Sequence, residues 1–308
     1  MVIIKTLIIM SIALFSTNAF GEKCTSSFSK SFSISSDVGF GNKYIKSLSN
    51  NFKKYGVCIV EKSKGHPTRL GQQSLRFEVK PGDCGYNNGW NDCKKDRERH
   101  ELSGDKHEDG EYWYAWSIYL PKDFKNVFPT KLAMGQFHQS KGHVVWMFQN
   151  SSGGYHIDNQ VNGYTQYEME VLEAKDMFEN WNDVLVNANW THTKKGFFKV
   201  WINGKLVLNH SGQTKKEGKK VYQKFGIYRS YMKRFKNYNK TDKVPGQVVY
   251  FDEVRTTKSC KKLKLDELGY NCKDLKNKIN EYMFKIHLLS TDSSYPLPYP
   301  FPTLFKLH

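Results

Sequence analysis

The sequence predicts an all-β protein, an antiparallel sandwich with a short helical extension at its C-terminal end. Short runs of alternating apolar and polar residues recur from Ser74 onwards, separated by turn residues. Aromatic residues make up 15% of the chain, and Trp, Tyr and Phe favour pleated strands. A stretch rich in Lys, Leu and Glu follows Cys260 and has helical character. Together these patterns favour one large β domain followed by a small helical part.

The expected strands follow one another at short intervals. One of them contains Asn203-Gly204, a strong signal for a two-residue hairpin. A short helical connection is expected over Val171–Phe178, and a longer helix over roughly Cys260–Leu288. The strand ranges are Leu75–Val79, Tyr112–Leu120, Lys131–His138, His143–Gln149, Tyr155–Val161, Trp181–Trp190, Gly196–Val207, Val221–Arg229 and Gln247–Arg255.

The N-terminal residues 1–21 are typical of a signal peptide. Lys5 precedes a short apolar run, Thr6–Phe15, and small residues follow at Ala19 and Gly21. The run is too short to cross a bilayer, although a retained anchor is an alternative. We therefore expect a secreted or periplasmic protein. Its β domain should cover residues 22–258, and a helical extension with a Pro-aromatic tail should cover residues 259–308.

All six cysteines lie beyond the expected cleavage site, which indicates disulfides in an exported chain. Proximity along the chain favours Cys84–Cys93 and Cys260–Cys272, which leaves Cys24–Cys58 as the third pair. A zinc site is the alternative, but the sequence contains no CxxC pair.

The formal net charge of +17 is spread along the chain rather than confined to a tail. Lysines and arginines are dense over residues 215–224 and 229–243. Such a charge attracts polyanions, namely nucleic acids, anionic membranes or acidic glycans. The alternative is a solvated lysine-rich surface without a specific partner. Because the chain is expected to be exported, an acidic glycan is the more natural partner than nucleic acid.

The segment Arg97–Leu102 carries charged side chains at every second position. If it forms a strand, Arg97, Arg99 and Glu101 share one face. Two guanidinium groups beside a carboxylate form an anion site that keeps its positive charge. Taken alone, the motif is better explained as a surface ladder of alternating charges.

A second segment, Gly135–Gln139, combines a glutamine and a histidine two residues apart. Period two places Gln136 and His138 on one face and Phe137 on the other, towards the core. Histidine is well suited to moving protons near neutral pH, and a glutamine amide can donate to a carboxylate or a sugar hydroxyl. A structural histidine is the simpler interpretation of this motif alone.

A third segment, Lys224–Arg229, places Lys224, Gly226 and Tyr228 on one face of a predicted strand. We expect Gly226 to leave space for a ligand between the lysine and the tyrosine. A neighbouring cation should favour the phenolate of Tyr228 and lower its pKa. Alone, this segment would also fit a strand in a basic surface.

The three segments together offer the groups that β-elimination on a uronic acid polymer requires. The enzyme must neutralise the carboxylate, remove the weakly acidic C5 proton and protonate the leaving glycosidic oxygen. Arg99 and Gln136 suit the first task. His138 or Tyr228 suits the second, and Tyr228 suits the third.

The ordered motifs R-x-E (Arg99–Glu101), Q-x-H (Gln136–His138) and K-x-G-x-Y (Lys224–Tyr228) resemble those of the jelly-roll polysaccharide lyases. This group includes alginate lyases, glucuronan lyases and heparin lyase I. The resemblance extends from about Leu75 to Arg255. It is greatest to the heparin lyase I-like group over Arg76–Leu102.

This resemblance implies a concanavalin A-like β-jelly-roll sandwich with its active site on the concave sheet. It also implies a lyase that acts on an acidic polysaccharide, with His138 and Tyr228 in proton transfer. We expect no nucleic-acid or membrane partner, and a monomer. The residues expected to bind substrate are basic or amide side chains, namely Arg99, Gln136, Lys224, Arg97 and Arg229.

No cofactor is expected for this chemistry. Some relatives bind calcium, and Asp252 and Glu253 are considered as ligands of a structural calcium ion. The alternative for these two carboxylates is a structural role at the end of a strand.

Two other functions fit the same fold. Glu168–Glu173 resembles the E-x-D-x-x-E strand of laminarinase-like glycoside hydrolases, in which retaining hydrolysis needs carboxylates about 5–5.5 Å apart. A non-catalytic glycan-binding module would keep the basic surface without requiring His138 and Tyr228. A secreted nuclease is disfavoured because no metal-binding carboxylate cluster beside a general base is recognisable.

Overall fold

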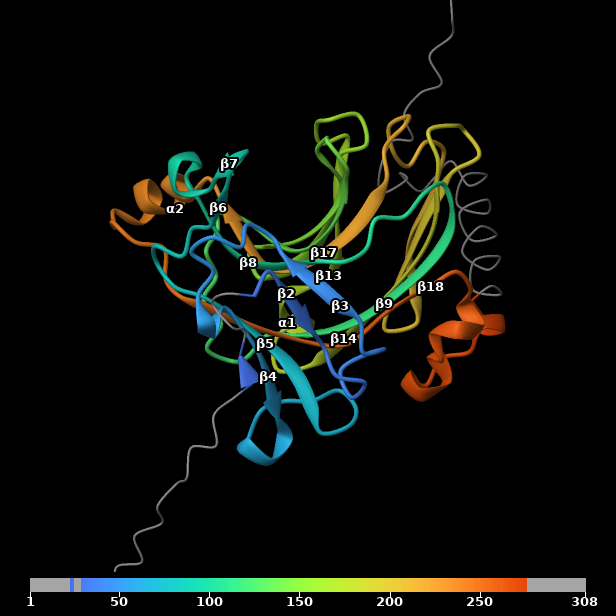
Figure 1. Ribbon diagram of the computed structural model, residues 1–308, viewed down its shortest axis with the longest axis horizontal. Helices are drawn as coiled ribbons and strands as arrows, with labels where there is room; N and C mark the ends of the chain where they lie inside the picture. The colour runs from blue at the N-terminus through green and yellow to red at the C-terminus, as the bar shows by residue number, and fades with distance from the viewer. Residues whose placement is uncertain (1–22, 25–28, 276–308) are drawn as a thin grey trace, which may run out of the picture.

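The computed structural model describes residues 23–24 and 29–275, which form two stacked antiparallel β-sheets (Figure 1). The first eight-stranded sheet has the order β1-β4-β5-β18-β9-β14-β15-β16, and the second has the order β13-β12-β11-β10-β17-β8-β3-β2. A separate two-stranded hairpin, β6–β7, lies beside helix α2 at one end of the sandwich (Figure 1). This is the predicted all-β jelly roll.

Most elements are strands of the two sheets. The first sheet contains β1 (Lys23–Cys24), β4 (Val57–Glu61), β5 (Gln73–Val79), β18 (Gln247–Thr257), β9 (Gly110–Tyr119), β14 (Trp181–Trp190), β15 (Phe197–Ile202) and β16 (Lys205–Ser211). The second contains β13 (Tyr167–Leu172), β12 (Gly154–Asn159), β11 (Val144–Ser151), β10 (Lys131–Gln139), β17 (Val221–Ser230), β8 (Arg97–Ser103), β3 (Lys43–Lys46) and β2 (Ser31–Ser33).

The remaining elements are short. They are the hairpin strands β6 (Tyr86–Asn87) and β7 (Trp90–Asn91), the helices α1 (Ala174–Met177) and α2 (Met232–Asn239), and the 3-10 turns η1 (Lys54–Gly56), η2 (Lys62–Lys64), η3 (Cys93–Lys95), η4 (Cys260–Leu263) and η5 (Leu265–Leu268). Among the described residues, none of these helices has the length and apolar character that a membrane span needs.

The predicted strands match observed ones, and the hairpin at Asn203-Gly204 is confirmed. Both of these residues have positive φ, 50° and 75°, as a two-residue hairpin turn requires. The helix predicted over Val171–Phe178 was wrong in extent, because β13 continues to Leu172 and α1 is a single turn. The strands β1, β2, β3 and β4 and the hairpin strands β6 and β7 were not predicted.

The predicted C-terminal helix begins instead as the two 3-10 turns η4 and η5, which lie against the first sheet. Residues 272–275 are helical, and the rest of that predicted helix, the Pro-aromatic tail and the signal peptide lie outside the described residues.

A continuous apolar core fills the space between the two sheets. Aromatic rings from opposite sheets contact one another across this space. The ring centroids of Trp116 and Phe148 are 5.1 Å apart, and those of Phe77 and Phe225 are 5.7 Å apart. Because the inner positions of each strand face this core, the alternate positions of the second sheet are directed outwards.

The three predicted disulfides are all present. Cys24–Cys58 joins β1 to β4, Cys84–Cys93 closes the loop that carries the hairpin β6–β7, and Cys260–Cys272 closes the C-terminal extension. The described residues contain no free cysteine. The loop closed by Cys84–Cys93 leads directly into β8, so it determines how that strand begins.

Arg229 lies away from the face on which Tyr228 is found, because neighbouring residues of a strand point to opposite sides. Its side chain is fully buried in the sandwich. There it donates from Nε to Glu98 Oε2 at 2.8 Å and also bonds the carbonyl oxygen of Pro245. The sequence proposed Arg229 as a substrate-binding residue, but this position excludes contact with a ligand on the outer face.

We predict that Arg229→Met strongly destabilises the protein, since it leaves the buried carboxylate of Glu98 without its cation. Removing one partner of a buried ion pair costs about 3–5 kcal/mol in the free energy of unfolding. Denaturant unfolding of the variant should show this loss, whereas the exposed control Lys233→Met should unfold like the wild type. Equal stabilities of the two variants would contradict the assignment.

Candidate functional site

The three predicted motifs lie on three neighbouring strands, β10, β17 and β8, in the middle of the second sheet. The strand register pairs Gln136 with Lys224 and Arg99 with Tyr228. His138 is opposite Tyr222, a residue that sequence reasoning had not selected. The structure therefore brings the five principal candidates onto one face of one sheet.

The carboxylate of Glu101 binds three of the candidate side chains on this face. Glu101 is only 2% exposed, and Lys224 Nζ lies 2.5 Å from its Oε2. Arg99 Nη1 donates to the same oxygen at 3.2 Å, and the amide of Gln136 donates to Oε1. Burial acts to raise the pKa of Glu101, but the charges of Lys224 and Arg99 outweigh it, so the pKa is lowered. Glu101 is thus ionised and holds three strands together.

Arg99 is fixed by a second carboxylate, which comes from the disulfide-closed loop. Its Nε and Nη2 donate to the two oxygens of Asp92 at 2.5 and 2.8 Å. Asp92 is fully buried and precedes the turn η3. The guanidinium carbon of Arg99 lies 3.9 Å from the centroid of the Tyr228 ring. The Arg99 guanidinium therefore makes a cation–π contact with the ring of Tyr228, and the carboxylates of Asp92 and Glu101 fix its position.

His138 is half-buried, and its ring is held in one orientation. Nδ1 lies 2.9 Å from the carbonyl oxygen of Gln139 and 3.1 Å from the hydroxyl of Tyr222. Because a carbonyl oxygen can only accept, this contact places the proton on Nδ1 and leaves the lone pair on Nε2. Burial, followed by the charge of Lys224, lowers the pKa of His138 to about 4. The ring is consequently neutral near pH 7, and Nε2 can accept a proton.

Tyr228 keeps its phenolic proton. We expected a neighbouring cation to lower its pKa, and Arg99 and Arg97 do act in that direction. Burial has the larger effect, however, and the pKa of Tyr228 is raised. Burial likewise raises the pKa of Tyr222 to about 12. The expectation of a lowered pKa was wrong because it did not take into account how far the sheet buries the ring.

Gly226 is required by the backbone rather than by a ligand. Its φ is +129°, and a Cβ at this position would lie 2.5 Å from the carbonyl oxygen of His100 and 2.7 Å from the Phe77 ring. Both contacts lie within the protein, against β8 and the opposite sheet. The expected role of Gly226 in leaving room for a ligand is replaced by this close approach.

The cations of this face differ in how they are paired. Arg99 and Lys224 are bound to buried carboxylates. Arg97 is half-buried on the same side of β8, and among the described residues it forms no ion pair. Its guanidinium carbon lies 4.9 Å from the ring centroid of Trp90. The positive charge that can still attract an anion is therefore located at the Arg97 end of the site.

The carboxylates of the alternative hydrolase motif lie elsewhere in the same sheet. Glu168 and Glu170 belong to the edge strand β13, separated from β10 by β11 and β12. Both flank His156, at 3.4 and 3.8 Å from its ring nitrogens. They are thus remote from the cluster around Glu101.

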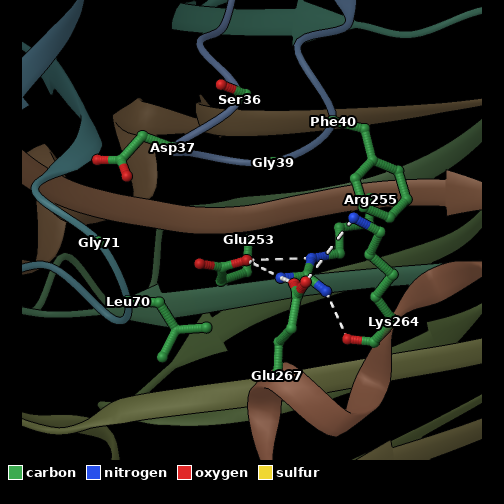
Figure 2. A pocket seen from close by; sticks show the side chains of 10 residues that line it. All are labelled: Ser36, Asp37, Gly39, Phe40, Leu70, Gly71, Glu253, Arg255, Lys264 and Glu267. Carbon is green, nitrogen blue, oxygen red and sulfur yellow. Dashed lines mark hydrogen bonds and ion pairs between the residues drawn. The ribbon is translucent and has the colours of Figure 1, made fainter.

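The two carboxylates considered as calcium ligands belong to β18 of the other sheet, and one of them, Glu253, lines a cavity of about 440 Å³ (Figure 2). Arg255 lies between Glu253 and Glu267 there, with a nitrogen 2.7 Å from the latter. Asp252 accepts the backbone N–H of Arg69 at 2.7 Å. Both carboxylates therefore have structural contacts. Within residues 23–24 and 29–275, no group of three or more His, Cys, Asp or Glu side chains is arranged to hold a metal ion.

Sequence reasoning missed three residues of the site, namely Asp92, Tyr222 and Trp90. Tyr222 lies two residues before Lys224 and could have been found by extending the same-face pattern. Asp92 and Trp90 reach the site through a loop whose path depends on the Cys84–Cys93 disulfide. The alternation of apolar and polar residues predicts strands, but it does not predict the path of such a loop.

The site contains one group that can accept a proton and one that can donate a proton. His138 is a neutral acceptor, and Tyr228 is a protonated donor supported by a cation. Groups whose surroundings drive their pKa values apart in this way are typical of acid–base catalysis.

Comparison with protein families identifies one match, to the polysaccharide lyase family over residues 61–255. This segment contains β8, β10 and β17 and all five principal candidates. A comparison with curated proteins gave no significant match.

Several solved structures are similar to this chain at low sequence identity. An endo-beta-1,4-glucuronan lyase from the fungus Trichoderma reesei is 16% identical, with a TM-score of 0.49, and 72% of this chain covers 94% of that one. A family 7 alginate lyase, A1-II', solved with substrate, is 11% identical, with a TM-score of 0.47 and coverages of 74% and 92%. An alginate lyase from Corynebacterium sp. is 16% identical, with a TM-score of 0.40 and coverages of 60% and 77%.

The family match spans more than half of the chain and includes every strand that builds the site. The chain belongs to the polysaccharide lyase family, and it is a polysaccharide lyase.

Proposed function

We propose that this lyase cleaves an acidic, uronate-containing polysaccharide by β-elimination on the outer face of β8, β10 and β17. The observation that carries the proposal is that a neutral His138 and a protonated Tyr228 lie on the same face as one buried, charge-balanced cluster, His138 towards Lys224 and Tyr228 against Arg99. A glycan-binding module would need neither of these protonation states.

His138 is the proposed general base. Its Nε2 accepts the C5 proton of the uronate, while the Gln139 carbonyl holds the Nδ1 proton in place. The electron pair left at C5 forms the C4=C5 double bond as the bond from C4 to the glycosidic oxygen breaks. The amide of Gln136 and the cations Arg99 and Lys224 lie beside the base, where charge develops on the substrate carboxylate.

Tyr228 is the proposed general acid. Its phenol donates a proton to the departing glycosidic oxygen, and the Arg99 guanidinium beneath the ring stabilises the phenolate that forms. Arg99 cannot lose its own proton, because the neighbouring carboxylates Glu101 and Asp92 raise its pKa despite its burial. No cofactor enters this mechanism.

The acidic nature of the substrate is inferred from charge. The formal net charge is +17, and Arg97 faces the site without an ion pair among the described residues. The likeness of Arg76–Leu102 to the heparin lyase I-like group points to the same substrate class. Three disulfides support export to an oxidising compartment, where extracellular polysaccharides are found.

We predict that Tyr228→Phe abolishes turnover and leaves binding of the polymer largely intact. The variant keeps the ring over Arg99 but removes the acid, and a general acid contributes ~10²–10⁴-fold to the rate. Tyr222→Phe is the matched control. It should lose far less activity, because the Gln139 carbonyl still orients His138. Ultraviolet absorbance of the conjugated product measures both variants, and near-normal activity of Tyr228→Phe would remove this residue from the mechanism.

We further predict that kcat/KM falls in acid only as the pH drops towards about 4, the pKa of His138, and not near 6.5. The base acts when neutral, so protonation on lowering the pH abolishes its function. Lys224→Met removes a charge that lowers this pKa, so the acid limb of the profile should move to higher pH. An unchanged acid limb in this variant, with measurable activity, would exclude His138 as the base.

A further inference from the structure

An exposed tryptophan stands on the hairpin next to the site. Trp90 belongs to β7, and its side chain is 40% exposed. The hairpin pairs Asn87 with Trp90 and Tyr86 with Asn91, so Trp90 and Tyr86 point to opposite faces of it. The Cys84–Cys93 disulfide closes the loop that carries this hairpin. The exposed indole offers a flat apolar face together with an N–H group, a combination suited to contact with a ligand.

Trp90 is connected to the centre of the site through Asp92. The indole Nε1 donates to Asp92 Oδ1 at 2.8 Å. That oxygen also accepts from Arg99 Nη2, and Arg99 in turn lies under the ring of Tyr228. The position of the indole is therefore determined by the same carboxylate that fixes the arginine beneath the proposed acid.

Arg97 adds an anion-binding group beside the indole. Its guanidinium carbon is 4.9 Å from the centroid of the Trp90 ring. Its Nε is buried and has no hydrogen-bond partner within the described part of the chain. Arg99 and Lys224 are both paired with carboxylates, so Arg97 carries the site's uncompensated charge. Because the Arg97 side chain is only half-buried, an anionic ligand can reach its guanidinium and form charge-assisted hydrogen bonds with it.

The strand register shows on which side of the site Trp90 and Arg97 lie. Along β8, Arg97 lies beyond Arg99, which pairs with Tyr228 on β17. The charge of Arg97 influences the pKa of Tyr228, whereas the charges that act on His138 come from Lys224, Glu101 and Arg99. The pair therefore lies on the side of the acid, away from the base.

We propose that Trp90 and Arg97 form a binding subsite for an anionic sugar unit of the leaving fragment. The indole face packs against the pyranose ring, and the guanidinium binds its carboxylate or sulfate group. This inference rests on the proposed function, because the leaving fragment is defined by proton donation from Tyr228. Trp90 is thus a specificity-determining residue that the three sequence motifs do not include.

The test compares the wild type with Trp90→Ala, Trp90→Phe and Arg97→Gln, and uses Tyr86→Ala as the matched control. Tyr86 is 45% exposed on the other face of the same hairpin, so its loss reports any general effect on the loop. The probes are octasaccharides of glucuronan, alginate and heparin, labelled at their reducing ends. Affinities are measured by calorimetry at two salt concentrations, and labelled products are separated by size.

Trp90→Ala and Arg97→Gln should each weaken binding of the best octasaccharide about 10-fold, which corresponds to ~1.4 kcal/mol. Trp90→Phe should recover most of the affinity, since it keeps an aromatic face. Only Arg97→Gln should also reduce the salt dependence of binding, because it alone removes a charge. Loss of the subsite should move cleavage towards the non-reducing end, so that labelled products become longer.

Equal affinities and product sizes for Trp90→Ala, Tyr86→Ala and the wild type would overturn the inference. If the wild type produces no unsaturated sugar from any probe, the proposed function fails. The affinities still decide the subsite in that case: selective weakening in Trp90→Ala supports it, and no weakening refutes it.

Discussion

The ion pairs and hydrogen bonds of the buried Glu101 carboxylate are the interactions on which the site depends. A buried charge is tolerated only when it is paired and hydrogen-bonded, and Glu101 satisfies this requirement with one group from each of three strands. Arg99 comes from β8, Gln136 from β10 and Lys224 from β17. The interactions that offset the cost of burying the Glu101 carboxylate therefore also align the side chains proposed to bind substrate.

Charge balance in this cluster explains how the site can be polar without being strongly basic. Two cations, Arg99 and Lys224, face two buried carboxylates, Asp92 and Glu101. His138 and Tyr228 next to them keep their neutral forms, mainly because they are buried. An acidic polymer is therefore attracted mainly by Arg97 and by the basic surface around the site. The centre of the site contains the groups proposed to transfer protons.

Much of the site could be predicted because strands alternate. Period two correctly placed Gln136 with His138 and Arg99 with Glu101 on one face, and the same rule, applied strictly, would have excluded Arg229. The mutual pairing of Arg99, Glu101 and Lys224 could not be predicted, since it depends on which strands are neighbours in the sheet. Proximity along the chain sufficed for the disulfides, but not for the path of the Cys84–Cys93 loop that brings Asp92 and Trp90 to the site. The role of Gly226 was misjudged because its constraint comes from the neighbouring strand β8 and from the opposite sheet.

On the outer face of β8, β10 and β17, the proposed reaction breaks the glycosidic bond by β-elimination rather than by hydrolysis. Incubation of the purified protein with glucuronan, alginate, heparin and a neutral glucan tests it directly when ultraviolet absorbance and new reducing ends are followed together. If the enzyme acts by β-elimination, both signals rise in parallel on at least one acidic polymer and neither rises on the neutral glucan. New reducing ends without absorbance, or no cleavage of any acidic polymer, would contradict it.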